Sequence, residues 1–252
     1  MNLLIFDTET TGLKDPELIQ FGALYKKNID GNYTTEEIIY HMKPETPILP
    51  ASTVIHGISQ EQANGYQNVS DIIPKIYNTL IQLETPLTFV GHNIKFDIDV
   101  MNRQFEKYLN KCFNPKFIID TLRLSKHLIP FDQIGGYSLD SVFYYFFPDK
   151  LNELIENRKN HSAIIDSTMT YQILIELKKL CDIKHSKELC WEEVIDFSAT
   201  LFDLSEEEWQ FGKHKGIKFK NTPKGYIAWC LNSDFAKDPK NIDIVYTLKK
   251  YL

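Results

Sequence analysis

The stretch FDTETTGL (residues 6–13) follows directly on the apolar run at residues 3–6. This run predicts a buried strand over residues 2–6, and Asp7 and Glu9 lie two residues apart on its continuation. Residues i and i+2 of a strand share a face, so the two carboxylates are expected to project side by side. Such charges repel unless a cation lies between them, and Mg²⁺ and Mn²⁺ prefer carboxylate oxygens. By itself the pair also fits an ordinary solvated strand end.

The composition is that of a globular protein, with 43% apolar and 25% charged residues over 252 positions. A net charge of −6 provides no global basic field, so a nucleic-acid partner would need a local basic patch and metal ions. The four cysteines form no CxxC pair, which indicates free thiols in a reducing compartment. No apolar run reaches the length of a membrane span and no signal peptide is evident, so we expect a cytoplasmic protein without a membrane partner. The oligomeric state stays open.

The periodicity of apolar residues predicts three consecutive short strands, followed by strands that alternate with helices. Strands are expected at 2–6, 18–26, 37–42, 87–90 and 117–120, with a turn at 28–32. The main helices are expected at 70–83, 98–108, 138–146, 163–181 and 190–204. This order predicts an α/β protein in which helices pack on a mixed sheet. Apolar content falls around residues 182–188, which indicates a domain boundary there.

Two further segments place acidic residues where open sheets present their sites, at strand ends and helix starts. Asp97 ends GHNIKFD (91–97), and HSAIID (161–166) contains His161 and Asp166. If these carboxylates meet Asp7 and Glu9, two divalent ions roughly 3.5–4 Å apart would neutralise them and support in-line phosphoryl displacement. An imidazole titrates near ~6.5, so His161 is the natural general base. Taken alone, His161 equally fits a surface residue at a helix start.

Six segments occur in the order found in the DnaQ-like superfamily and resemble its DEDDh branch. They are FDTETTGL, VIHGIS (54–59), GHNIKFD, IDTLRLS (119–125), YSLDSV (137–142) and HSAIID. The resemblance implies an RNase H-like fold, with a five-stranded mixed sheet flanked by helices, and 3′→5′ exonuclease activity with two Mg²⁺ or Mn²⁺ ions. By position, it implies that His161 is the general base and that the metal ligands are Asp7, Glu9, Asp97 and Asp166.

The same resemblance implies how the 3′ end of a nucleic acid is held. Leu13 would lie against the terminal base, and the backbone N–H groups of Thr10 and Thr11 would face the terminal sugar. His56 and Ile58 would belong to a loop that flanks the penultimate base, and Asn93 and Phe96 would line the same cleft. Each of these residues also fits a role in packing or turn formation.

The C-terminal stretch 205–252 has its own basic and aromatic character. Residues 211–225 contain five lysines and no acidic residue, and aromatic residues are interleaved with them. This pattern predicts a nucleic-acid surface that includes Lys213 and Lys215, although a solvated basic turn over a small aromatic core fits as well. The helical spacing of Tyr226, Trp229 and Cys230 favours a core position for Trp229. The string FGKHKG (211–216) is similar to the C-terminal extension of exonuclease X-like proteins, which favours DNA over RNA.

The leading interpretation is a metal-dependent exonuclease that releases 5′-mononucleotides from DNA with a free 3′ end. Its expected parts are a nuclease domain at 1–182, a linker and connecting helix at 183–204, and a small module at 205–252. Three alternatives remain: an RNA 3′→5′ exonuclease, a proofreading subunit with polymerase or repair partners, and a nucleic-acid-binding protein without catalysis.

Overall fold

The computed structural model describes residues 1–159 and 162–252, apart from the side chains of residues 154, 157–159 and 239. Its strands are β1 (Asn2–Thr10), β2 (Leu18–Ile29), β3 (Asn32–His41), β4 (Leu87–Gly91) and β5 (Phe117–Asp120). The first helices are α1 (Pro50–His56), α2 (Gln60–Asn64), α3 (Val69–Gln82), α4 (Ile94–Leu109), α5 (Thr121–Leu128) and α6 (Phe131–Ile134). They are followed by α7 (Leu139–Phe146), α8 (Leu151–Lys159), α9 (Ala163–His185), α10 (Trp191–Ser198), α11 (Lys224–Asn232) and α12 (Ile242–Lys249).

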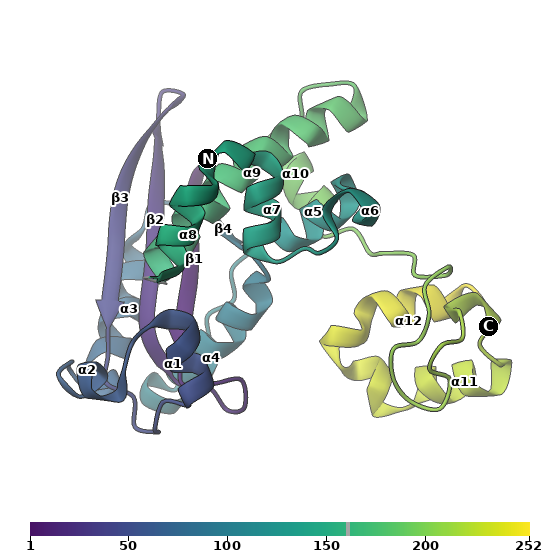
Figure 1. Ribbon diagram of the computed structural model, residues 1–252, viewed down its shortest axis with the longest axis horizontal. Helices are drawn as coiled ribbons and strands as arrows, with labels where there is room; N and C mark the ends of the chain where they lie inside the picture. Colours follow the sequence, from purple (N-terminus) through teal and green to yellow (C-terminus); the bar gives the residue numbers. More distant parts are fainter. Residues whose placement is uncertain (160–161) are drawn as a thin grey trace. The chain divides into compact units, whose positions relative to one another are not determined.

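The strands form one five-stranded mixed sheet in the order β3-β2-β1-β4-β5 (Figure 1). β1 pairs antiparallel with β2 and parallel with β4, and β4 pairs parallel with β5. The sequence-based expectation of a five-stranded mixed sheet flanked by helices is therefore confirmed. Because β1 and β4 run in the same direction, their carboxyl ends lie at one edge of the sheet, where α/β folds place their sites.

The β2–β3 hairpin is longer than the apolar pattern predicted. Its turn consists of Asp30 and Gly31, both with positive φ (51° and 89°), the geometry of the two-residue turns that match strand twist. Pairing therefore continues to Ile29 opposite Asn32, and β3 begins five residues before the predicted position. The early part of β3 is exposed and polar, so it carries no hydrophobic signal that a sequence pattern could detect.

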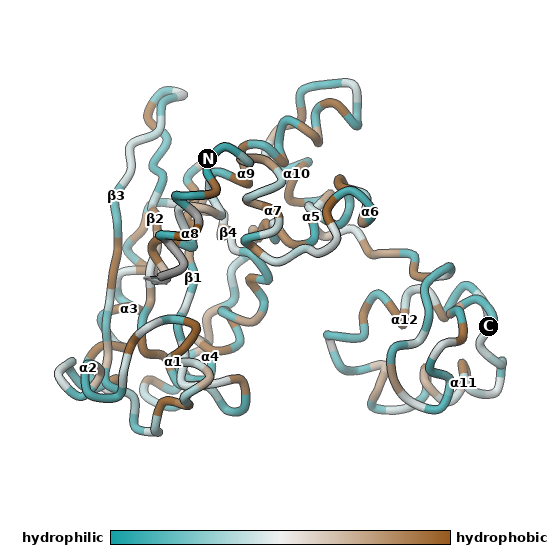
Figure 2. The backbone as a smooth tube through the Cα atoms, in the orientation of Figure 1, coloured by the Kyte–Doolittle hydropathy of each residue, from teal (hydrophilic) through white to brown (hydrophobic). Residues whose placement is uncertain are grey.

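Helices cover both faces of the sheet, and β1 contributes alternate residues to the two hydrophobic layers. Leu3 and Ile5 pack in a cluster with residues of α5, α7 and α9, whereas Leu4 and Phe6 pack in a cluster with residues of α3 and α4. Hydrophobic stretches accordingly recur along strands and helices of this part of the chain (Figure 2). Because side chains of a strand alternate, Asp7 and Glu9 continue the α9 face.

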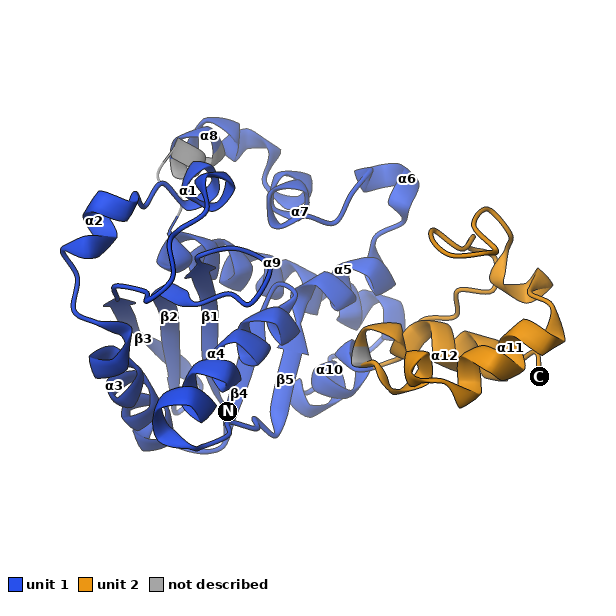
Figure 3. Ribbon diagram, turned by 90° about the horizontal axis from the view of Figure 1, so that it is seen from below, with its two compact units in different colours: residues 1–199 blue, residues 200–252 orange. Residues whose placement is uncertain are grey.

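The chain divides into two compact units, Met1–Ala199 (unit 1) and Thr200–Leu252 (unit 2), coloured blue and orange in Figure 3. The helix expected over 190–204 ends at Ser198 and packs on β5 and α5 within unit 1. α10, which falls within the expected linker and connecting helix at 183–204, therefore belongs to unit 1.

Unit 2 has a small core of its own around Trp209, with Phe219, Ile227, Cys230 and Leu248. The predicted core position of Trp229 is wrong, because 57% of this residue is exposed. Helical spacing indicated that one face of α11 is buried, and Ile227 and Cys230 occupy that face. The large core aromatic comes instead from the loop before FGKHKG.

All four cysteines are free thiols, as the absence of a CxxC pair indicated.

Throughout residues 1–159 and 162–252, no helix is both long and apolar enough to cross a membrane.

Candidate active site

β1 and α9 bring three carboxylates together. Asp7, Glu9 and Asp166 each offer one oxygen, and the three oxygens lie within 4.8 Å of one another. Glu9 is buried and the other two residues are partly buried. At this separation, and with an effective dielectric constant near ~20, each pair of charges repels by roughly 3 kcal/mol. Three hard oxygen donors this close fit a divalent cation such as Mg²⁺ or Mn²⁺.

Gly22 of β2 lets the start of α9 approach the sheet. It lies directly opposite Asp7 in the β1–β2 register. A Cβ atom at Gly22 would lie 2.5 Å from the backbone nitrogen of Ile164 and 2.6 Å from the carbonyl carbon of Ala163. The Ser167 hydroxyl donates to the Gly22 carbonyl oxygen at 3.0 Å and fixes the first turns of the helix there. Because Gly22 has no side chain, the start of α9 packs directly against the sheet. This close packing places Asp166 near Asp7.

Gln20 lies two residues before Gly22 on the same face of β2, and it holds the first residue of α9. It pairs with Glu9 across the β1–β2 ladder and is buried. Its Oε1 accepts a hydrogen bond from the backbone N–H of Ala163 at 2.7 Å. Its Nε2 lies 2.6 Å from Nε2 of His41. The cross-strand neighbours of the two N-terminal carboxylates therefore position the helix that carries the third.

Sequence reasoning missed Gln20 and Gly22. Their i, i+2 spacing repeats that of Asp7 and Glu9, but this parallel is meaningful only when the strand register is known. A register shifted by one residue would move both side chains to the other face of the sheet. The spacing of Gln20 and Gly22 is therefore visible in the sequence, but the sequence alone does not show that these residues belong to the site.

Asp97 is not part of the three-carboxylate cluster. Its Oδ1 accepts a hydrogen bond of 2.6 Å from the hydroxyl of Thr8, the residue between Asp7 and Glu9. Three of the four expected carboxylates therefore form the group within 4.8 Å, and Asp97 is held beside it through Thr8. Asp97 comes from α4, which packs on the face of β1 opposite to that of α9.

Burial is the main influence on the Asp97 carboxyl. It raises the pKa of Asp97 from 3.8 to about 7, although the hydrogen bond from Thr8 acts in the opposite direction. At neutral pH this carboxyl is therefore protonated in a substantial fraction of molecules. A nearby cation would favour its ionised form, so cation binding and proton release are coupled at this position.

Asp120 and His92 fix the loop between β4 and α4. Oδ1 of Asp120 accepts from the backbone N–H of Asn93 at 3.0 Å and also caps the start of α5. Nε2 of His92 donates to the carbonyl oxygen of Tyr137 at 2.8 Å, and its Nδ1 lies 3.0 Å from the Thr121 hydroxyl. Burial lowers the pKa of His92, which keeps the imidazole neutral. Both ring nitrogens are engaged, so His92 is a positioning residue for the loop.

His161, the expected general base, lies outside the described residues. Its neighbour Ser162 is the N-cap residue of α9, and Asp166 lies in the first turn of that helix.

The segment after β1 offers an exposed apolar side chain four residues beyond Glu9 in the sequence. Leu13 is 87% exposed. The expected role of the Thr11 backbone N–H is corrected, because that group donates to the Glu17 carbonyl oxygen at 3.0 Å. The Thr10 hydroxyl donates to the Gly12 carbonyl oxygen at 3.0 Å, which shapes the turn.

The expected loop at residues 54–59 is a helix end followed by a turn. His56 ends α1, and Gly57 has a φ of 73°. Both His56 and Ile58 are buried, and Nδ1 of His56 accepts from the backbone N–H of Ile58 at 3.0 Å. These two side chains therefore support the turn from within.

Two residues of the same helix, Val54 and Ile55, are 85% and 60% exposed. Sequence reasoning missed these two residues, and the apolar pair at the start of VIHGIS was the available signal. Asn93 is exposed at the N-terminus of α4, and Phe96 packs partly against the α3–α4 layer.

Lys213 and Lys215 are exposed in the loop of unit 2 that contains FGKHKG. Lys218 and Lys220 of the same segment pair with Glu206, at 3.1 and 2.6 Å between Nζ and the carboxylate oxygens. Within the described part of the chain, no acidic side chain forms an ion pair with Lys213, Lys215 or Lys224. Lys213, Lys215 and Lys224 are therefore the lysines of 211–225 without an acidic partner among the described residues.

Comparison with known proteins identifies the same regions. Residues 4–174 match the exonuclease family RNase T. Among curated relatives, DNA polymerase III PolC-type of Thermotoga maritima is 29% identical over 203 residues, which are 78% of this chain and 14% of the polymerase. Exodeoxyribonuclease 10 of Escherichia coli K12 is 24% identical over 254 residues, with 99% of this chain and 98% of the relative covered. The chain thus spans a small part of the polymerase relatives and nearly all of exodeoxyribonuclease 10.

Solved structures share the fold. Exonuclease X in complex with 5′ overhanging duplex DNA superposes with a TM-score of 0.50 at 22% identity, over 78% of this chain and 99% of that chain. E. coli exonuclease I in complex with a dT13 oligonucleotide gives a TM-score of 0.56 at 19% identity, over 73% of this chain and 42% of that chain. The family match includes β1, α4 and the start of α9, which carry all four acidic residues discussed above. This chain therefore belongs to the RNase T exonuclease family.

Proposed function

We propose that this protein is a divalent-metal-dependent 3′→5′ exonuclease that removes 5′-mononucleotides from the 3′ ends of DNA. The observation that carries the proposal is the cluster of Asp7, Glu9 and Asp166 within 4.8 Å, inside the region that matches the exonuclease family. The near-complete coverage of exodeoxyribonuclease 10 supports DNA as the polymer. So does the shared fold of exonuclease X, which was solved with duplex DNA.

In this proposal Asp7, Glu9 and Asp166 hold the cation, with Asp97 as a fourth carboxylate beside them. Bound there, Mg²⁺ or Mn²⁺ supplies the positive charge that offsets the carboxylates and makes a water more acidic. Two ions fit the expected reaction, and the zinc-bound form of E. coli exonuclease I is a structural neighbour that carries a divalent metal.

His161 is the proposed general base. It accepts a proton from the attacking water while the water oxygen forms a bond to the phosphorus atom. The bond from phosphorus to the 3′ oxygen of the remaining strand breaks, that oxygen is protonated, and the last nucleotide leaves with a 5′ phosphate. The sequence supports this role, because His161 is only five residues before Asp166, which lies in the first turn of α9.

The terminal nucleotide is proposed to lie against Leu13, whose side chain is the most exposed apolar group of the 6–13 segment. Thr10, Thr11, Asn93 and Phe96 line this region, whereas His56 and Ile58 support it from beneath. Lys213 and Lys215 of unit 2 are proposed to contact phosphates. The nuclease domain is proposed to be residues 1–182 with α10 packed on it, and residues 205–252 form the basic module.

A polymerase-associated role is a second candidate, because PolC-type polymerases contain a related segment at 29% identity. The two roles differ in what the isolated chain does. A free exonuclease shortens DNA alone, whereas a proofreading subunit needs a polymerase to hold its substrate.

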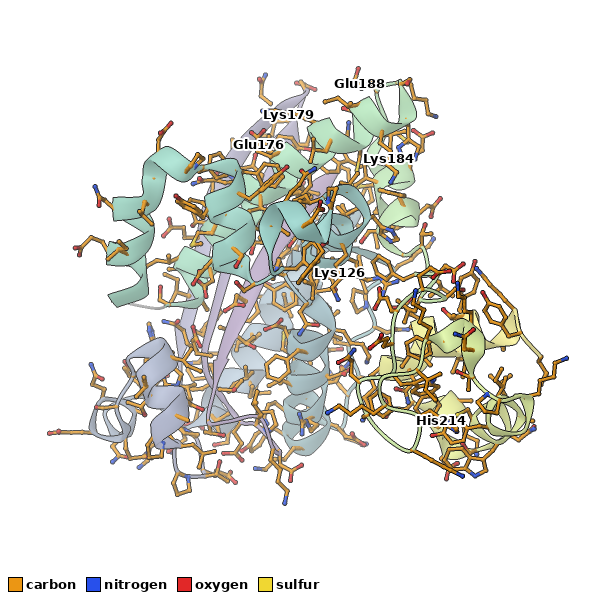
Figure 4. All side chains as sticks on the ribbon, turned by 45° about the vertical axis from the view of Figure 1, so that its right-hand side comes forward. Lys126, Glu176, Lys179, Lys184, Glu188 and His214 are labelled. Carbon is orange, nitrogen blue, oxygen red and sulfur yellow. The ribbon has the colours of Figure 1, made fainter. Side chains whose placement is uncertain are left out.

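The test uses 5′-labelled single-stranded DNA, the matched duplex and the matched RNA, each with the purified full chain and Mg²⁺. We expect a ladder of shortened DNA that disappears in EDTA and with Asp166→Asn. Glu176→Gln is the matched control, because it removes a carboxylate from the same helix, and among the described residues Glu176 forms an ion pair only with the exposed Lys179 (both labelled in Figure 4).

Each alternative predicts a different pattern. A ladder with RNA alone would make the protein an exoribonuclease, and activity only beside a polymerase would make it a proofreading subunit. DNA binding without turnover in the unmodified chain, under all these conditions, would leave a non-catalytic binding protein.

A further inference from the structure

We propose that Trp229 on α11 is a stacking platform for an unpaired base of single-stranded nucleic acid. This inference rests on the proposed function only in the choice of nucleic acid as ligand, because the platform lies entirely within unit 2.

The first observation is the exposure of Trp229. More than half of this indole is in contact with solvent, although unit 2 buries Trp209 completely. Its ring stacks on Tyr226 with centroids 5.3 Å apart and an interplanar angle of 25°. Tyr226 in turn meets the ring of His214 at 4.3 Å. Tyr226 therefore contacts both His214 and Trp229, and the three rings form one row. The Trp229 ring, at the end of this row, stays exposed to solvent.

The second observation is free space next to the indole. Gly225 lies one helical turn before Trp229, and helical side chains lean toward the N-terminus, so the two positions share a face. A Cβ atom at Gly225 would meet nothing within 4 Å. The face of α11 one turn before Trp229 is therefore open, and no side chain there blocks the approach of a planar base.

The third observation is the charge around this row. His214 lies between Lys213 and Lys215, and Lys224 begins α11. None of the three lysines has an acidic partner among the described residues. The first turn of α11 contains no acidic residue, and its N-cap Pro223 makes no side-chain cap. An exposed aromatic ring in the same small unit as these lysines fits a strand whose phosphates contact the charges and whose bases stack.

The charge and the stacking geometry favour nucleic acid over an apolar protein partner. A hydrophobic docking face would need further apolar groups around the indole, whereas the rings in line with it are those of Tyr226 and His214, and His214 lies between two lysines in the sequence. Stacking is tolerant of base identity, since every base presents a π-face. The platform is therefore expected to bind single strands without strong sequence preference and to discriminate against duplex, whose bases are already stacked.

The experiment measures binding of fluorescein-labelled dT and mixed-sequence oligonucleotides, and of the matched duplex, to the full chain in EDTA. EDTA removes the metal and stops turnover, so the experiment measures binding alone. A negative result would therefore count against the stacking platform and not against the exonuclease proposal. We expect Trp229→Ala to weaken single-strand binding about tenfold without changing the salt slope, and Trp229→Phe to retain most of the affinity. Binding should quench tryptophan fluorescence, and Trp229→Phe should remove most of that quenching.

Tyr246→Ala is the matched control, because Tyr246 is also a partly exposed aromatic of unit 2, with Lys250 over its ring at 4.4 Å. Circular dichroism and melting temperature check that each variant is folded. Equal affinity of Trp229→Ala and the unmodified chain for single strands would overturn the proposal. So would a loss shared equally by Trp229→Ala and Tyr246→Ala, or by single strands and duplex.

Discussion

Unit 1 and unit 2 use charge in opposite ways. Residues 1–199 contain 27 acidic and 19 basic residues, and three of the acids converge where β1 meets α9. Residues 200–252 contain seven acidic and nine basic residues, and the lysines at 213, 215 and 224, which have no acidic partner among the described residues, are exposed. Converging carboxylates need a rigid frame, because their repulsion would otherwise separate them. Exposed lysines need no frame, because water screens them. The buried site therefore depends on register and packing, and the basic surface depends on composition.

The largest expected effect tests the chemistry assigned to unit 1. His161→Asn should lower turnover by about 10²- to 10⁴-fold, because no other group then takes the proton from the attacking water. The rate of the unmodified enzyme should rise with pH as imidazole loses its proton near ~6.5, and the variant should lose this rise. Rates with saturating labelled DNA between pH 5.5 and pH 8.5, ~0.5 apart, measure both effects. An unaltered pH profile would remove His161 from this role.

The next effect tests the frame that holds the carboxylates. Gly22→Ala places a methyl group where the backbone of residues 163–164 lies, so α9 must shift. A displacement of about 1 Å at a catalytic group costs about 10²-fold in rate, and overpacking costs about 1–3 kcal/mol of stability. Gly136→Ala is the control, because its nearest neighbour would be Ser141 Oγ at 3.9 Å. Turnover and melting temperature are measured together, and a Gly22→Ala enzyme equal to Gly136→Ala in both would contradict the proposed role of close approach.

A smaller effect concerns Asp97 in the absence of metal. Burial raises the pKa of Asp97 to about 7, so the folded protein binds this proton more tightly than the unfolded chain does. Its contribution to stability is therefore complete at low pH and declines as pH rises from about 4 toward about 7. In EDTA, Asp97→Asn should flatten this decline and raise the melting temperature at pH ~8, by about 2–4 °C for each kcal/mol that the buried charge costs.

Asp99→Asn is the control for this measurement, because Asp99 is exposed on the same helix and pairs with Lys95 at 2.8 Å. Thermal melts across the pH range are compared for the three proteins. A melting temperature of Asp97→Asn that follows the unmodified protein at every pH would show that the Asp97 charge is not destabilising.

The smallest expected effect belongs to unit 2. Lys213→Ala with Lys215→Ala should weaken single-strand binding mainly at low salt, because each phosphate contact contributes about 0.7 to the slope of log affinity against log salt. The slope should fall by about 1.4, whereas kcat at saturating DNA stays unchanged. Lys218→Ala with Lys220→Ala is the control, because both of these lysines form ion pairs with Glu206. Equal slopes for the two double variants would mean that the loop lysines do not contact phosphates.

Much of the fold was predictable because its signals are local. The apolar run before Asp7 predicted β1, and the alternation of strands and helices predicted a mixed sheet. The ends of elements were less predictable. The polar first half of β3 carries no hydrophobic periodicity, and only the two-residue turn at 30–31 explains why the strand begins at Asn32.

The candidate site was predictable in its residue types and not in its arrangement. Asp7, Glu9 and Asp166 could be chosen from strand-end and helix-start positions. The same reasoning selects Asp97, but the structure holds Asp97 against Thr8 and outside the group of three carboxylates. Trp229 is the corresponding case in unit 2, because helical spacing does not distinguish the residue that completes a core from one that remains outside it.

The sequence by itself determined which chemistry is available: closely spaced carboxylates after an apolar strand, a histidine near a helix start, and lysines among aromatic residues. The tertiary structure alone decided which of these groups meet. Strand register set Gly22 opposite Asp7 and Gln20 opposite Glu9, and close packing at that glycine brought α9 to β1. The physical reason is that residue type is a local property, whereas proximity between residues more than 150 positions apart depends on backbone register and on the volume of the side chains between them.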